Sequence, residues 1–202
     1  MTMFGDGRRA KSSDHLRRTA RIYVDALAER LDELSRLATQ ARTIRGYSVD
    51  TYPTFKAIYY EFLRQSDEYQ GLSYLAQEAI AALPREDDGQ RAAQRELADN
   101  FRQLQVPMLR EVIRTNFRLL RIWEDRVTQG VELPLDSRQA FLDCVRVIHE
   151  AKSQLQREEY APLLDPETLE IADRAKRLLE TLLERAPNLV EFLEDHDRNE
   201  RI

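Results

Sequence analysis

Residues 90–129 read QRAAQRELADNFRQLQVPMLREVIRTNFRLLRIWEDRVTQ, the longest stretch of this chain with a helical pattern of apolar residues. Pro107 lies near its middle, whereas the other prolines stand where such patterns stop. Proline offers no N–H to the carbonyl of Gln103, and its ring crowds that carbonyl. However, Gln105 and Val106 would be poor caps for a new helix. The stretch therefore predicts one continuous helix, kinked at Pro107.

The two halves of this stretch differ in how much of the helix surface is apolar. Up to the proline and the residue directly after it, the apolar residues form a narrow stripe: Leu97, Phe101, Leu104 and Met108. After it, they cover more than half of the circumference: Val112, Ile113, Phe117, Leu119, Leu120, Ile122, Trp123 and Val127. A helix that is apolar nearly all round is typically the buried centre of a helical assembly. We therefore predict that burial, and not only direction, changes at residue 107.

Further helices are predicted on both sides of this stretch, at about 14–45, 51–83, 136–160, 165–185 and 188–193. Two helix ends carry strong signals, since Asp165-Pro166-Glu167 is typical of a helix start and Gly130 of a helix end. Ala, Glu, Lys, Leu and Arg make up close to half of the 202 residues, a composition typical of long helices. The predicted fold is all-α, an elongated antiparallel bundle of five or six helices.

The predicted domain organisation is simple. We expect a disordered basic tail over 1–12, one helical-bundle domain over 13–195, and a frayed C-terminus over 196–202. The net charge is −5, yet six basic residues lie in the first 21 positions: Arg8, Arg9, Lys11, Arg17, Arg18 and Arg21. An acidic body argues against nucleic acid as the main partner. Nucleic-acid or anionic-surface binding through this basic N-terminal arm stays open as an alternative.

The expected compartment is the cytoplasm. Cys144 is the only cysteine, so no intramolecular disulfide can form. No apolar run is long enough to span a membrane, and no apolar segment of a signal peptide follows Met1.

The sequence offers little for catalysis. No Glu-x-x-His pair of a di-iron bundle occurs in it. Cys144 and His149 point about 140° apart around a helix, so they cannot share a metal ion. We therefore expect no enzyme activity, no metal site and no cofactor.

One histidine lies inside a long predicted helix, in the segment His149-Glu150-Ala151-Lys152-Ser153. This segment resembles the H-x-x-K-G core of histidine phosphotransfer domains, which are also helical bundles. The resemblance covers five residues, with Ser153 in place of the glycine. It implies His149 as phosphoacceptor and Lys152 as the charge that neutralises phosphate. A histidine without a role on the flank of the helix is the simpler interpretation.

Two surface features are candidates for contact with a partner. Arg110, Arg114, Arg118 and Arg121 lie within about 80° of one another on the predicted third helix. They either bind an anionic partner or form ion pairs inside the chain. On the second helix, Tyr60, Leu63 and Tyr74 lie on a flank beside the predicted core, which is either a second buried face or a partner-binding patch.

Taken together, these features favour a non-catalytic interaction or scaffold protein that acts through protein–protein contacts. We expect it to form homo-oligomers and to bind a protein partner. The two alternatives are a phosphotransfer-like signalling domain that uses His149 and a binder of anionic surfaces.

Overall fold

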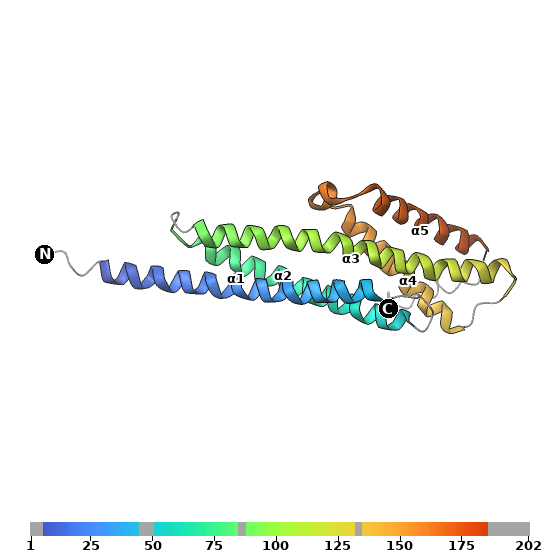
Figure 1. Ribbon diagram of the computed structural model, residues 1–202, viewed down its shortest axis with the longest axis horizontal. Coiled ribbons are helices and arrows are strands. Elements are labelled where there is room, and N and C mark those ends of the chain that lie inside the picture. Colours follow the sequence, from blue (N-terminus) through green and yellow to red (C-terminus); the bar gives the residue numbers. More distant parts are fainter. Residues whose placement is uncertain (1–5, 45–50, 85–87, 132–134, 186–202) are drawn as a thin grey trace, which may run out of the picture. The chain divides into compact units, whose positions relative to one another are not determined.

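A computed structural model describes the backbone of residues 6–44, 51–84, 88–131 and 135–185. Within these ranges the chain forms five α-helices, one 3-10 helix and no strand (Figure 1). The elements are α1 (Asp6–Thr43), α2 (Tyr52–Ala81), α3 (Asp88–Thr128), α4 (Leu135–Leu155), η1 (Glu158–Leu163) and α5 (Pro166–Arg185). The predicted all-α class is therefore confirmed.

Helix α3 runs through Pro107 without a break, as predicted. Between residues 88 and 104 only Phe101 is buried, whereas most residues from 105 to 123 are buried. These buried residues include Thr115 and Asn116, so even polar positions of the second half are covered. The predicted change of burial at residue 107 is therefore confirmed.

The chain divides into two compact units, and the division cuts α3 next to Pro107. Unit 1 comprises Met1–Thr43 and Phe55–Gln105, and unit 2 comprises Ile44–Thr54 and Val106–Ile202. The sequence led us to expect one domain over 13–195. The bounds of this predicted domain include residues outside the described ranges. The single domain therefore remains a prediction, which the division into two units does not test.

In unit 1, α2 runs antiparallel to α1 and to the first half of α3. An apolar cluster near one end brings together Ala20 and Val24 of α1 with Ile80 and Leu83 of α2. Farther along, Tyr69 of α2 stacks on Phe101 of α3, with ring centroids 4.2 Å apart and planes at 8°. The core of unit 1 is thus built from apolar side chains of α1, α2 and the first half of α3.

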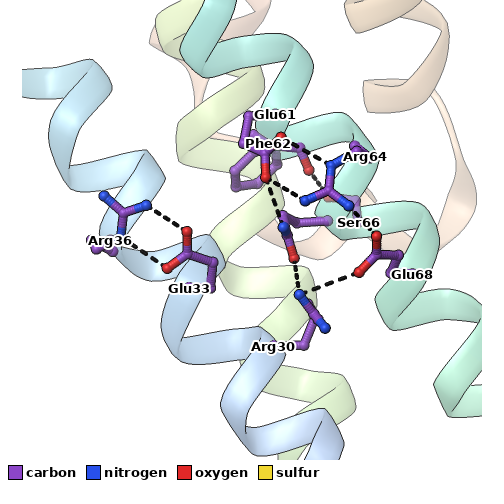
Figure 2. A network of polar contacts seen from close by, with 9 residues as sticks. Arg30, Glu33, Arg36, Glu61, Phe62, Arg64, Ser66 and Glu68 are labelled. Carbon is purple, nitrogen blue, oxygen red and sulfur yellow. Dashed lines mark hydrogen bonds and ion pairs between the residues drawn. The ribbon is translucent and has the colours of Figure 1, made fainter.

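A polar network joins α1 to α2 within unit 1 (Figure 2). Arg30 donates a 2.5 Å hydrogen bond to the amide oxygen of Gln65 and lies 3.2 Å from a carboxylate oxygen of Glu68. Gln65 in turn donates to Glu61 at 2.7 Å. Hydrogen bonds from Arg64 and Gln65 lower the pKa of Glu61 to about 2. Arg30 therefore connects two helices, whereas Arg36 pairs with Glu33 of its own helix at 2.5 Å.

In unit 2, α4 runs antiparallel to α3, and α5 runs parallel to α3. Trp123 packs on Phe141, and the Cys144 thiol donates to the backbone oxygen of Asn116 at 3.6 Å. Along α3 and α5 the residue numbers of contacting partners increase in the same direction, as in a parallel pair of helices. The contacts are Arg110 with Asp165, Arg114 with Glu167, and Phe117 with Arg174. The 3-10 helix η1, with Tyr160 buried, follows α4 and precedes α5.

Both strong end signals are confirmed. The Asp165 carboxylate accepts the N–H of Thr168 at 2.7 Å, so Asp165 caps α5. Gly130 has a φ of 70°, and the N–H of Val131 donates to the oxygen of Arg126 at 3.0 Å, the pattern of a glycine-ended helix.

Two helix boundaries differ from the prediction, and two predicted segments lie outside the described residues. Helix α1 begins at Asp6, so the prediction of a disordered tail is wrong for residues 6–12; a helix that has already formed gains one hydrogen bond per added residue, even without an apolar pattern. Helix α4 ends at Leu155 because Arg157 takes an extended conformation. The predicted helix at 188–193 and the frayed end at 196–202 lie outside the described residues.

Candidate functional site

The candidate contact residues of α2 are accessible. Tyr60 is 41 % exposed and Tyr74 is 63 % exposed, while Leu63 is half-buried. Tyr59 and Tyr69 of the same helix are instead buried, at 1 % and 2 % exposed. The alternative of a second buried face therefore does not hold for Tyr60 and Tyr74 within this chain.

These residues belong to one narrow face of the helix. At about 100° per residue, Tyr60, Leu63, Asp67, Gly71 and Tyr74 lie within an arc of about 80°. We name this set the tyrosine flank. Tyr60 and Tyr74 are about 21 Å apart along the axis, and Lys56 lies over the Tyr60 ring at 5.7 Å.

Within the described residues, neither close packing nor backbone conformation requires a glycine at position 71 of the tyrosine flank. A Cβ built at Gly71 meets no atom within 4 Å, and the residue has no positive φ. Glycine in a helix interior costs about 0.5–1 kcal/mol relative to alanine. The cost is therefore not offset by any close packing among the described residues.

The four arginines predicted as a stripe on α3 mostly form ion pairs inside unit 2. Arg110 lies 2.7 Å from Asp165, and this carboxylate also caps α5. The backbone N–H of Thr168, the main cause, and Arg110 together lower the pKa of Asp165. This arginine therefore ties α3 to the start of α5.

The remaining arginines of the stripe differ from one another. Arg114 contacts Glu167 at 2.6 Å and Glu111 at 3.4 Å. Arg121 pairs with Glu124 of its own helix at 2.9 Å, and Arg118 is exposed. Ion pairs inside the chain therefore engage Arg110, Arg114 and Arg121, although the side chain of Arg121 remains more than half exposed.

His149 is exposed on α4 and lines a hollow of about 370 Å³ between α4 and α5. Lys152 and Lys176 line the same hollow, with Val145, Ile148 and Leu179 as its apolar part. Lys152 lies 3.4 Å from Asp173, so its charge is partly neutralised. The predicted pair His149 and Lys152 is therefore brought to one hollow.

Cys144 is fully buried, and burial raises the pKa of its thiol. Among the residues that the structure describes, no three His, Cys, Asp or Glu side chains are grouped closely enough to hold a metal ion. Within the described ranges, no helix is both long enough and apolar enough to cross a membrane.

Two residues of these surfaces were not predicted from the sequence. Leu75, 43 % exposed, follows Tyr74 and could have been found from its position beside the tyrosine flank. Lys176 reaches the His149 hollow from α5, a different helix. No local pattern marks such a residue, because its role depends on which faces of two helices meet.

Comparison with known proteins does not extend these observations. No protein-family model matches the chain, and neither the curated proteins nor the solved structures include a match.

Proposed function

We propose that this protein is a non-catalytic helical interaction protein, a scaffold or adaptor that works through protein–protein contacts. The tyrosine flank of α2 is the proposed contact surface. Its two exposed tyrosines are of the type enriched in interface hot spots. A partner helix that crosses at Gly71 would account for the glycine, because only glycine lets another backbone approach so closely.

The unexplained glycine is the observation that carries this proposal. Tyrosines can be exposed on any protein surface without a role. A glycine that weakens a helix, placed between two exposed tyrosines on the same arc, is harder to explain without a partner. Self-association is the contact that we expect, with the flanks of two chains facing each other.

The test combines mass measurement with variants of the tyrosine flank. Light scattering on the purified chain should give a mass above 23.7 kDa, the mass of one chain. Gly71→Leu and Tyr74→Ala should shift the mass toward that of the monomer. Gln40→Leu, an exposed change on α1, is the matched control and should leave the mass unchanged.

A strict monomer at all concentrations would refute self-association. Affinity capture with the wild-type chain, Gly71→Leu and Gln40→Leu then tests the broader proposal. A partner held by wild type and Gln40→Leu but lost by Gly71→Leu supports it. Identical capture by all three chains contradicts a role of the tyrosine flank.

A phosphotransfer-like domain is the second candidate, and the hollow beside His149 favours it. An exposed imidazole beside two lysines could accept a phosphoryl group, whose charge the lysines would neutralise. Acid-labile phosphorylation from a phosphohistidine donor should then occur, and His149→Gln should abolish it while His15→Gln does not. Absence of any transfer would exclude this candidate.

Binding of nucleic acid or anionic surfaces by the basic N-terminal arm stays a prediction. The side chains before residue 14 lie outside the described part, while Arg17 and Arg21 pair with Asp14 and Asp25 at 3.5 and 3.7 Å. Such binding should weaken steeply with salt, and its absence at about 50 mM salt would exclude it.

A further inference from the structure

A second hollow in unit 2 is lined mainly by polar residues, three of which are arginines. It lies between α3 and α5 and has a volume of about 320 Å³. Its lining is formed by Phe117, Arg121, Glu124, Arg174, Arg177, Leu178 and Thr181. Three arginines from two helices thus line one space.

Two of the three guanidinium groups are held in place by the chain. Arg174 lies over the ring of Phe117, with its central carbon 5.3 Å from the ring centroid. Arg121 is held by Glu124 at 2.9 Å. Stacking and pairing of this kind reduce the conformational freedom that an arginine would lose on binding a ligand.

The third group, Arg177, is exposed and forms no ion pair with any residue in the described ranges. The carboxylate near Arg174 is a poor competitor for a ligand. Glu170 lies 3.8 Å from Arg174, and both side chains are more than half exposed. Solvent screens such a pair, which therefore gives way readily to a ligand of higher charge.

We infer that this hollow is a binding site for a phosphate dianion, either free or as a small phosphomonoester. Arginine forks match the oxygens of phosphate in pairs, and three of them offer more donors than one carboxylate can accept. Phe117 and Leu178 add apolar surface beside the charged groups, where a small organic substituent would pack. The site is independent of the tyrosine flank and of His149.

Calorimetric titration at low ionic strength, in a buffer free of phosphate and sulfate, tests this site. The probes are inorganic phosphate, phenyl phosphate and benzoate. Saturable binding of a phosphate probe is expected, with benzoate at least about tenfold weaker because it brings one charge and two oxygens. Tighter binding of phenyl phosphate than of inorganic phosphate would indicate a phosphomonoester, and the reverse order would indicate free phosphate.

Variants locate the binding. Arg177→Gln should weaken it about tenfold, and Arg177→Lys should restore part of the loss, since lysine keeps the charge but not the fork. Lys176→Gln, in the His149 hollow, is the matched control and should bind as wild type. Arg177 and Lys176 are both exposed, and circular dichroism checks that every variant is folded. No saturable phosphate binding, or equal losses in Arg177→Gln and Lys176→Gln, would overturn the assignment.

Discussion

The hydroxyl of Tyr52 donates a 2.8 Å hydrogen bond to the side-chain oxygen of Asn116, and both residues are buried. Asn116 uses its amide nitrogen to donate to the oxygen of Val112, also at 2.8 Å. The start of α2 is therefore attached to the densely buried half of α3 by an amide whose oxygen and nitrogen are both hydrogen-bonded.

Tyr52→Phe should lower the free energy of unfolding by about 1–3 kcal/mol, because a buried amide oxygen loses its donor while the packing is kept. Urea denaturation followed by circular dichroism measures this loss. Tyr74→Phe is the control, since Tyr74 is 63 % exposed and should change stability very little. Equal effects of the two changes would show that the hydrogen bond is not the cause.

Tyr69→Phe should behave in the opposite way. Its hydroxyl is buried without a hydrogen-bond partner among the described residues, and the stacking on Phe101 does not require it. Removing the hydroxyl should leave the free energy of unfolding unchanged or raise it by about 1 kcal/mol. A clear loss in the same urea experiment would contradict this assignment.

Tyr69 also predicts how stability changes at alkaline pH. Burial raises its pKa from the ordinary value of 10.0 to about 12. Below pH 10 its hydroxyl is protonated in both the folded and unfolded states. Between pH 10 and 12 the unfolded state loses the proton first, so stability should fall with rising pH. Alkaline unfolding of wild type and Tyr69→Phe checks this, because the variant should lose less stability between pH 10 and 12.

Arg30→Ala should destabilise the protein more than Arg36→Ala. Arg30 bonds to buried Gln65 and to Glu68 across two helices, whereas Arg36 pairs only with Glu33 in the described interactions. We expect a loss of about 1–2 kcal/mol for Arg30→Ala and a clearly smaller loss for Arg36→Ala. Thermal and urea unfolding of both variants measures these losses. Equal losses would show that the network of Figure 2 does not stabilise the packing of α1 on α2.

Gly71→Ala should raise the free energy of unfolding by about 0.5–1 kcal/mol, because the new methyl group meets no neighbour within 4 Å and alanine favours the helix. The same variant should retain self-association better than Gly71→Leu. Destabilisation by alanine would mean that the glycine serves the fold of the chain itself.

Cys144 should resist alkylation in the native protein. The thiol is fully buried, and burial raises its pKa, so little reactive thiolate is present and none is accessible. Iodoacetamide should react on the order of a hundredfold more slowly with the folded chain than with the urea-unfolded chain, since reaction requires opening. Equal rates would show that α4 is not packed as described.

The sequence alone was sufficient for features that depend on neighbours along the chain. The helical period located the five α-helices of the described ranges, the poor caps before Pro107 predicted that α3 continues, and Asp165 and Gly130 marked helix ends. The change of burial at Pro107 was also predictable, because a helix that is apolar nearly all round can be stable only when covered. The start of α1 was misplaced because an apolar pattern is not required to extend a helix.

Only the tertiary structure decided which charged and aromatic side chains are free to act. Arg110 is engaged by Asp165, 55 positions away, while Arg121 meets Arg174 and Arg177 around one hollow. Such groupings depend on the rotation and direction in which two helices pack. Many pairings of amphipathic faces bury similar apolar area, so the period of a sequence predicts that a face is covered but not by which residues.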